Sequence, residues 1–233
     1  NILSRKNTPR VITFHDLSFL HYPNFFSWRQ RFWHWLQNVE KQAREADHLI
    51  AVSEFTKSDL INFFRIPEEK ISVIYSGISD TFKKIKREKS PNPFILYLGT
   101  LEPRKNIPAI IRAFNILKKN PTLKEWKLVI AGKPGWLWGE ILKEAAESPE
   151  VENIIFKGPV SEEERFRLYS MAEVFVYPSF FEGFGFPPLA GRRLSRRAAR
   201  QGPRAPGRPA KAGAGRQRST QAARQRHRAS GAG

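Results

Sequence analysis

The residues best suited to chemistry lie in a glycine-rich loop that follows an apolar run at 174–177. Pro178 ends that run because proline lacks the donor that a strand needs. The loop then offers a carboxylate, two glycines and an aromatic ring, namely Glu182, Gly183, Phe184 and Gly185. Glycine lets backbone approach a ligand closely, and prolines at 187 and 188 suit a first helical turn whose free amides attract an anion. This order of strand, loop and helix start predicts a corner that holds a phosphate.

Three earlier strand candidates also end in a glycine. The apolar runs at 94–98, 127–131 and 154–157 are followed by Gly99, Gly132 and Gly158. Ligands of open α/β sheets bind outside the carboxyl ends of the strands, which meet at one edge. The sequence therefore predicts one sheet edge, built from four glycine-bearing loops, that receives an anionic ligand.

A diphosphate at this edge needs positive charge close to it. The chain has no Asp-x-Asp pair, so the usual carboxylate platform for a magnesium or manganese ion is missing and we expect no metal. Arg104 and Lys105 can supply the charge as a fork and a point charge, and they would stabilise a leaving diphosphate. The alternative is a solvated basic pair at the start of a helix, although that position opposes the helix dipole.

His15 and Asp16 follow a short β-rich run at 10–14. Since ligands gather at the carboxyl ends of strands, His15 stands where chemistry is expected. The alternative is a histidine that caps a loop with Asp16 as its partner.

The elements that must position these residues alternate between strand and helix. In the first half we expect strands at 10–14, 48–52 and 70–75, with helices from Ser27 and at 53–64. In the second half we expect helices at about 107–119, 140–148 and 161–171 between the strands that end in glycine. Such alternation is typical of parallel sheets covered on both faces.

The helix after Ser27 is rich in aromatic residues. Apolar residues at helical spacing are Trp28, Phe32, Trp35, Leu36, Val39, Ala43 and Ala46. We expect most of them to lie in the core. Trp33 lies off that stripe and, with Arg29 and Arg31, could face lipid headgroups or an apolar acceptor.

The charge of the chain is concentrated in its last 43 residues. The whole chain of 233 residues carries a formal charge of +18, but 191–233 holds thirteen Lys and Arg and no Asp or Glu, which leaves +5 for the rest. Only Leu194 in this tail is a large apolar residue, so we expect the tail to be disordered. It is either a natural basic arm or an out-of-frame end, and we expect the latter.

The absence of cysteine excludes disulfides, and no apolar run spans a bilayer, so we expect a soluble cytoplasmic protein.

The motifs together resemble the group 1 (family 4) retaining glycosyltransferases. The likeness runs from about Arg10 to Leu189. It rests on the stretch 99–106, the turns at 131–133 and 158–160, and above all the loop from Pro178 to Leu189. The resemblance implies a GT-B architecture, in which two Rossmann-like domains bind a nucleotide sugar in the cleft between them without a metal.

The resemblance also implies a role for each site residue. Arg104 and Lys105 would hold the donor diphosphate, with Gly99 nearby, and Glu182 would contact sugar hydroxyls. Backbone amides of Gly183, Phe184 and Gly185 would face the diphosphate and the sugar. The base would lie against Gly158 and Val160, and the transferred sugar near His15. Ser53-Glu54 resembles the strand-to-helix turn of the family that faces the cleft.

Two departures from the family pattern stand out. A second glutamate, which binds the ribose, is expected eight positions after Glu182, where this chain has Ala190. The chain also begins late, since a full Rossmann half needs more strands before Arg10. We therefore expect two incomplete domains, at 1–81 and 94–190, a linker at 82–93, and the tail at 191–233, with weak or no activity in this chain alone.

The leading hypothesis is a metal-independent transferase of polysaccharide biosynthesis. It would move a hexose such as mannose, with retention, from a nucleotide-diphosphate sugar to a glycan or lipid-linked acceptor, in peripheral contact with the inner face of the membrane. One alternative is a nucleic-acid-binding protein that acts through the arginine-rich tail. That tail lacks the aromatic residues that stack on bases, so no specific nucleic acid is expected. Another alternative is a sugar-binding module without catalysis.

Overall fold

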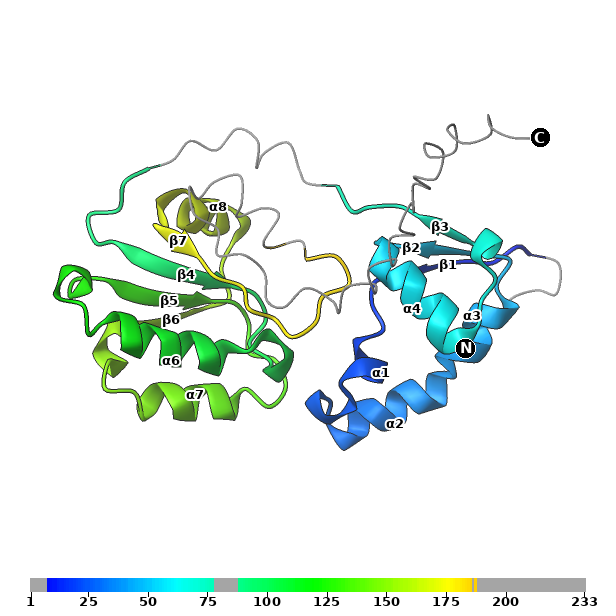
Figure 1. Cartoon of the computed structure of the whole chain (residues 1–233), viewed down its shortest axis with the longest axis horizontal. Coiled ribbons are helices and arrows are strands. Elements are labelled where there is room, and N and C mark those ends of the chain that lie inside the picture. The colour runs from blue at the N-terminus through cyan, green and yellow to red at the C-terminus, as the bar shows by residue number, and fades with distance from the viewer. Residues whose placement is uncertain (1–7, 78–87, 186, 188–233) are drawn as a thin grey trace, which may run out of the picture. The chain divides into compact units, whose positions relative to one another are not determined.

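The computed structural model describes residues 8–77, 88–185 and 187. Within these ranges the chain forms two parallel sheets flanked by helices (Figure 1). The predicted α/β fold with two Rossmann-like parts is confirmed. The predicted tail at 191–233 and much of the predicted linker at 82–93 lie outside the described residues, so the proposed domain boundaries stay predictions.

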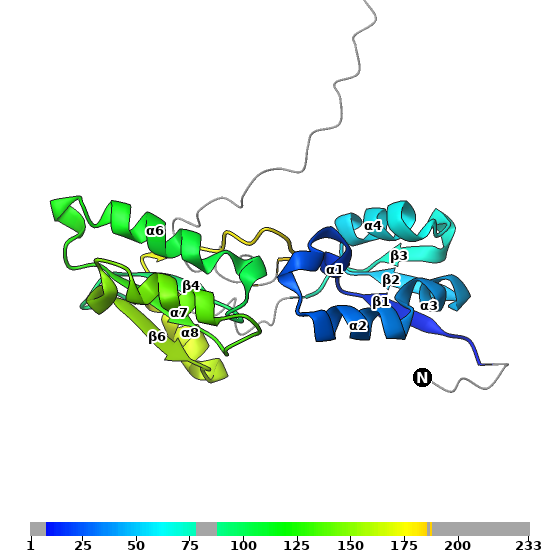
Figure 2. The same cartoon turned by 90° about the horizontal axis from the view of Figure 1, so that it is seen from below.

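The first sheet has three parallel strands in the order β1-β2-β3. The strands are β1 (Val11–Phe14), β2 (His48–Ala51) and β3 (Ile71–Val73). The helices between them are α1 (Ser18–His21), η1 (Pro23–Phe25), α2 (Trp28–Gln37), α3 (Val39–Glu45), α4 (Glu54–Phe64) and η2 (Glu68–Lys70). Helix α4 lies on one side of the strands and α2 on the other (Figure 2). Leu17, Leu49 and Leu60 are fully buried between these layers.

The prediction for the apolar stripe after Ser27 is wrong. Ser27 does cap α2, with a full capping box to Gln30, but the helix ends at Asn38, whose φ is +46°. Asparagine tolerates this left-handed conformation, and the turn reorients α3, so the residues before and after it do not share one face. Ala43 and Ala46 are buried, whereas Trp28, Phe32, Trp35 and Leu36 are all more than half exposed.

The second sheet has four parallel strands in the order β6-β5-β4-β7. They are β4 (Phe94–Leu98), β5 (Lys127–Ala131), β6 (Ile154–Gly158) and β7 (Val174–Phe175). The connecting helices are η3 (Pro103–Lys105), α6 (Ile107–Leu117), η4 (Pro121–Leu123), α7 (Gly139–Ala146), η5 (Val151–Asn153) and α8 (Glu162–Met171). Helices α6 and α7 lie on one side of the sheet and α8 on the other (Figure 1).

The core of this second part agrees with its sequence pattern. Strand β4 is an unbroken apolar run because both of its faces are covered. Helix α6 buries Ile107, Ile110, Ile111 and Phe114, while Leu117 at the helix end is exposed. Strands β3 and β7 are shorter than predicted. After β7, the amide of Val176 still donates to the carbonyl of Leu96 at 2.9 Å, but the chain then turns away.

The glycines at the strand ends pack directly against one another. Gly132 has a φ of +147°, and a Cβ on it would lie 1.8 Å from the carbonyl oxygen of Gly99. Its amide donates to the carbonyl of Gly158 at 2.8 Å. Gly132 is therefore required by the close approach of β4, β5 and β6, whatever ligand binds beyond them.

Candidate functional site

One open pocket gathers most of the predicted site residues. Its empty volume is about 870 Å³. The predicted residues that line it are His15, Gly99, Arg104, Lys105, Glu182, Gly183, Phe184 and Gly185, together with Asp16, Glu102 and Tyr177 among others. Gly158 and Val160 are not among its lining residues, and Val160 packs against the second core instead.

The short helix η3 places the two predicted cations at the pocket. It begins after Glu102 and ends at Asn106, whose left-handed conformation starts α6. Only 6% of Lys105 is exposed, and 12% of the Arg104 side chain. The alternative of a solvated basic pair is therefore wrong, because both side chains point into the protein.

Arg104 is held by several partners at once. Its Nη2 and Nε donate to Glu102 Oε1 at 2.7 and 3.1 Å, and its Nη1 donates to the carbonyl of Phe181 at 2.9 Å. Carboxylate oxygens of Glu182 and Asp16 lie 3.6 and 4.0 Å from Nη1. Burial acts to lower the pKa of Arg104, but Glu182, Glu102 and Asp16 outweigh it and raise the pKa. The guanidinium therefore stays charged and fixed in place.

Lys105 lies deeper and contacts two other groups. Its Nζ donates to Glu182 Oε1 at 2.6 Å and to the Tyr177 hydroxyl at 2.9 Å. The ring of Tyr177 stacks on that of Tyr97, with centroids 5.7 Å apart. Burial lowers the pKa of Lys105, while the charge of Glu182 opposes that change. Glu182 thus supports the positive charge of a buried ammonium group.

The loop at 178–185, here called the Glu182 loop, is hydrogen-bonded to the short helix η3. The amide of Phe180 donates to the carbonyl of Arg104 at 2.9 Å, and Asn106 Nδ2 donates to the carbonyl of Pro178 at 3.4 Å. With the bond from Arg104 to Phe181, these contacts hold the loop against η3. Residues about 75 positions apart in the chain therefore form one unit.

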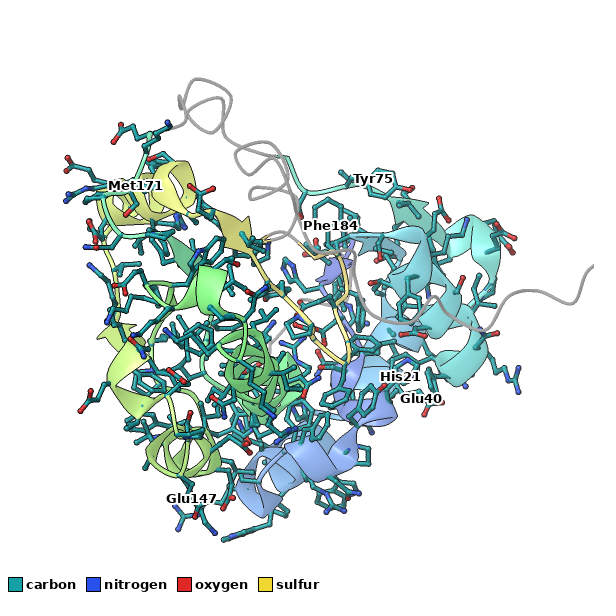
Figure 3. The ribbon with its side chains drawn as sticks, turned by 60° about the vertical axis from the view of Figure 1, so that its left-hand side comes forward. His21, Glu40, Tyr75, Glu147, Met171 and Phe184 are labelled. Carbon is teal, nitrogen blue, oxygen red and sulfur yellow. The ribbon has the colours of Figure 1, made fainter. Side chains whose placement is uncertain are left out.

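Gly183 packs between the start of α4 and the loop that follows β1. Its carbonyl accepts hydrogen bonds from the hydroxyls of Ser53, which caps α4, and of Thr56, the latter at 3.5 Å. A Cβ at this position would lie 1.9 Å from the carbonyl oxygen of His15. The need for glycine here comes from this close approach. Next to it, the rings of Phe184 and Tyr75 lie 6.1 Å apart (Figure 3).

His15 is exposed at the pocket, as predicted from its place after β1. Asp16 accepts hydrogen bonds from the Ser18 amide at 2.9 Å and from the Ser18 hydroxyl at 2.6 Å. Within the described residues, Asp16 therefore pairs with Ser18 and approaches Arg104, and the alternative of a His15–Asp16 pair is not what the structure has.

Sequence reasoning missed Glu102 and Tyr177. Glu102 is 3% exposed, and a glutamate two residues before an arginine gives no sign that it will be buried with it. Tyr177 ends an apolar run, so its ring was assigned to the core, which is where it lies. The signal that could have found it is its hydroxyl, because a tyrosine at a strand end carries a polar group toward the ligand edge.

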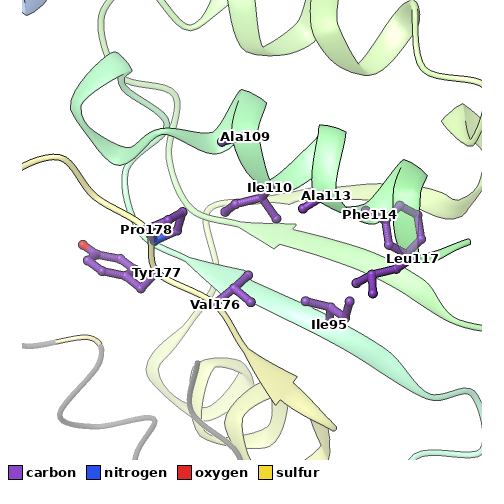
Figure 4. Close-up of a pocket in the computed structure, with 9 residues that line it drawn as sticks. All are labelled: Ile95, Ala109, Ile110, Ala113, Phe114, Leu117, Val176, Tyr177 and Pro178. Carbon is purple, nitrogen blue, oxygen red and sulfur yellow. The ribbon is translucent and has the colours of Figure 1, made fainter. Parts of the chain in front are cut away.

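A second pocket lies between α6 and the end of β7 and has different chemistry (Figure 4). Its lining side chains are apolar apart from that of Tyr177, and they include Ile95, Ile110, Phe114 and Val176. It offers no charged side chain to a phosphate, whereas the pocket around Lys105 does.

The described residues contain neither a metal-binding cluster nor a membrane-spanning helix. They contain no cluster of three or more His, Cys, Asp or Glu that could hold a metal ion. None of the described helices is both long enough and apolar enough to cross a membrane.

Two families match successive stretches of the chain. Residues 78–190 match the family described as Glycosyl transferases group 1, and residues 1–82 match Glycosyltransferase Family 4. O-antigen chain mannosyltransferase B of Escherichia coli is 31% identical over 190 residues, which cover 77% of this chain and 49% of that protein. Serotype-specific mannosyltransferase WbdA of Escherichia coli is 30% identical over 169 residues, covering 67% of this chain and 21% of that protein. This chain thus spans half or less of the length of these relatives.

Solved structures share the fold. Sucrose-phosphate synthase from Thermosynechococcus elongatus aligns with a TM-score of 0.63 at 21% identity, over 78% of this chain and 47% of that one. HepE of Anabaena, solved in complex with UDP and glucose, aligns with a TM-score of 0.60 at 20% identity, over 82% of this chain and 52% of that one.

Proposed function

Because the chain belongs to the group 1 glycosyltransferases, we propose that its site transfers a hexose from a nucleotide-diphosphate sugar to a glycan or lipid-linked acceptor. The observation that carries the proposal is the buried Lys105, with Arg104 beside it, at a pocket that Gly183 and Gly185 also line. Mannose is the hexose that the names of these two relatives favour.

The geometry supports separate roles for the cations, the backbone amides and the carboxylate of the pocket. As the bond between the sugar and the diphosphate breaks, negative charge grows on the leaving oxygen. Fixed cations and backbone amides stabilise such charge without having to reorganise. Lys105 and Arg104 would supply the cations, and 183–185 the amides. Glu182 would orient the sugar through its hydroxyls.

We also propose that the transfer retains the configuration of the sugar and needs no metal. The acceptor hydroxyl would attack from the face that the diphosphate leaves, and its proton would pass to the departing phosphate oxygen. The new bond joins the acceptor oxygen to the sugar carbon as the old bond to phosphate breaks. The two cations take the place that a divalent ion occupies in sites with paired carboxylates.

Donor binding tests this proposal directly. GDP-mannose and UDP-glucose are titrated into the full chain by calorimetry, with and without EDTA. We expect at least one to bind with a Kd between about 1 μM and 1 mM, the usual range for substrates, and EDTA to leave that Kd unchanged. Failure of both donors to bind folded protein contradicts the function, and loss of binding in EDTA contradicts metal independence.

We further propose that the exposed face of α2 contacts an anionic membrane surface. Helix α2 leaves Trp28, Phe32, Trp33 and Trp35 more than half exposed, and it carries Arg29 and Arg31 but no acidic residue. Amphipathic helices with arginine beside tryptophan lie at lipid headgroups, because the rings enter the interface while the cations meet anionic lipid. A lipid-linked acceptor would be reached from such a position.

Vesicle sedimentation tests the membrane contact. We expect the chain to bind vesicles that contain phosphatidylglycerol and not vesicles of pure phosphatidylcholine. Replacing Arg29 and Arg31 together by glutamine should weaken binding roughly 30-fold, since each basic residue near an anionic surface contributes about 1 kcal/mol. The matched control is Ile116→Ser, which removes an exposed apolar side chain from α6. Equal loss in both variants, or unchanged binding in the first, contradicts the proposal.

A further inference from the structure

We infer that Glu182 competes with the donor diphosphate for Lys105 and Arg104, and so makes the site favour the sugar-bearing donor over the sugar-free nucleoside diphosphate. This inference rests on the proposed function and deepens it, because it assigns to one residue the discrimination between substrate and product.

The first step of the argument is the position of the Glu182 carboxylate. It lies 2.6 Å from Lys105 Nζ and 3.6 Å from Arg104 Nη1, which are the two groups that would hold a diphosphate. Both cations are more deeply buried than Glu182, whose side chain is 23% exposed, and all three line the pocket. An anion that enters from the pocket therefore meets Glu182 at the place where it would bind.

Lys105 has one donor left for a second anion. An ammonium group has three N–H donors, and here one goes to Glu182 and one to the Tyr177 hydroxyl. Arg104 already donates to Glu102 and to the carbonyl of Phe181. A phosphate oxygen can reach hydrogen-bond distance of Lys105 with good geometry once Glu182 gives up its own contact.

The carboxylates around the two cations also favour displacement of Glu182 by a diphosphate. Among the described residues, the carboxylates of Glu102, Asp16 and Glu182 surround the cations Arg104 and Lys105, so the cluster has a formal charge of −1. Adding a diphosphate to a partly buried cluster that is already negative is unfavourable. One carboxylate must therefore move away from the cations.

Glu182 is the carboxylate free to move. Glu102 is buried and bonded to both Nε and Nη2 of Arg104, and Asp16 is held by the amide and hydroxyl of Ser18. The contacts that the structure describes for Glu182 are to the two cations and to the hydroxyl of Tyr177. Displacement of Glu182 therefore breaks one further described contact, and the Tyr177 hydroxyl stays bonded to Lys105.

What replaces those contacts depends on the ligand. Sugar hydroxyls can donate to the displaced carboxylate, and such charge-assisted hydrogen bonds are strong. A nucleoside diphosphate has no sugar at that position, so displaced Glu182 gains nothing and returns to Lys105. Glu182 thereby weakens binding of the product after the sugar has left and promotes its release.

Matched titrations of Glu182→Gln test the inference. Gln keeps the shape of the side chain and removes its charge. Wild type and variant are titrated with GDP and GDP-mannose, and with UDP and UDP-glucose, at mildly acidic pH so that Lys105 stays protonated in both. We expect the variant to bind the nucleoside diphosphate about tenfold more tightly and the sugar nucleotide no better than wild type. Glu163→Gln, which removes an exposed carboxylate from α8, should change neither affinity.

The possible outcomes distinguish failure of the inference from failure of the proposed function. If Glu182→Gln leaves nucleoside diphosphate binding unchanged or weaker while the sugar nucleotide loses affinity, Glu182 only contacts the sugar, and the inference is wrong although the proposed function stands. If wild type binds neither ligand, the inference and the proposed function are both wrong. Should Glu182→Gln fail to fold, Glu182→Asp serves in its place. It keeps the charge but withdraws it from Lys105 by one methylene, so it should shift the ratio of the two affinities in the same direction by a smaller factor. An unchanged ratio overturns the inference.

Discussion

Replacing Lys105 with methionine should weaken binding of the donor by roughly 10- to 150-fold. Methionine keeps the length and apolar stem of the side chain and removes only the ammonium group. The lost interaction is a hydrogen bond between charged groups, which contributes about 1.5–3 kcal/mol. The Tyr177 hydroxyl and Glu182 also lose their shared partner, so the side chains that form the pocket become less fixed. Calorimetric titration with GDP-mannose and UDP-glucose measures the change.

A matched control separates this effect from a general loss of positive charge. Lys157→Met removes a lysine that is 39% exposed and paired with Glu164 at the surface, at 2.9 Å. Exposed pairs contribute little, so donor affinity should stay at the wild-type value. Wild-type affinity in Lys105→Met would mean that the diphosphate binds elsewhere, and an equal loss in both variants would mean that the attraction is non-specific.

Replacing Gly132 with alanine should produce the largest loss of stability among these substitutions. The new Cβ would lie 1.8 Å from the carbonyl oxygen of Gly99, and the φ of +147° is one that side chains disfavour. Overpacking and backbone strain each cost about 1–3 kcal/mol, so the free energy of unfolding should fall by about 2–6 kcal/mol. Thermal unfolding followed by circular dichroism should show a Tm lower by at least about 4 °C.

Gly139→Ala is the control for this substitution. A Cβ at Gly139, the first residue of α7, meets nothing within 4 Å, and alanine favours helix. Stability should remain equal or rise slightly. If Gly132→Ala unfolds at the wild-type temperature, the strand ends can separate without cost, and the close packing of the three glycines does not stabilise the fold.

Much of the fold could be predicted because local signals and burial agree. Strands β4 and β5 have the predicted bounds, since each is a short apolar run covered on both faces. Ser27, Ser53 and Ser161 cap helices where the sequence places them, because a cap is a local hydrogen bond. The aromatic stripe after Ser27 was mispredicted because one left-handed residue, Asn38, changes the direction of the chain, and helical spacing carries no sign of that change.

The site could be predicted in its residue types but not in its connections. The positions of Arg104, Lys105 and Glu182 at strand ends brought them to one pocket, as expected from parallel topology. Their mutual contacts were beyond prediction, because Glu182 lies 77 residues after Lys105 and nothing local links them. The burial of Glu102 and the hydroxyl contact of Tyr177 arise from three-dimensional packing alone. Gly132 was expected at the ligand edge, but glycine is required there because the backbone of Gly99 lies too close for a side chain.

The contacts of Arg104 have a consequence for how the site is assembled. One guanidinium bonds to Glu102 before η3 and to the Phe181 carbonyl in the Glu182 loop, and it lies 4.0 Å from Asp16 after β1. Groups linked in this way strengthen one another, so weakening any one contact loosens the rest. Lysine, with its single charged atom, could not span all three partners. The pocket should therefore form cooperatively, as one all-or-none unit that joins three separate stretches of the chain.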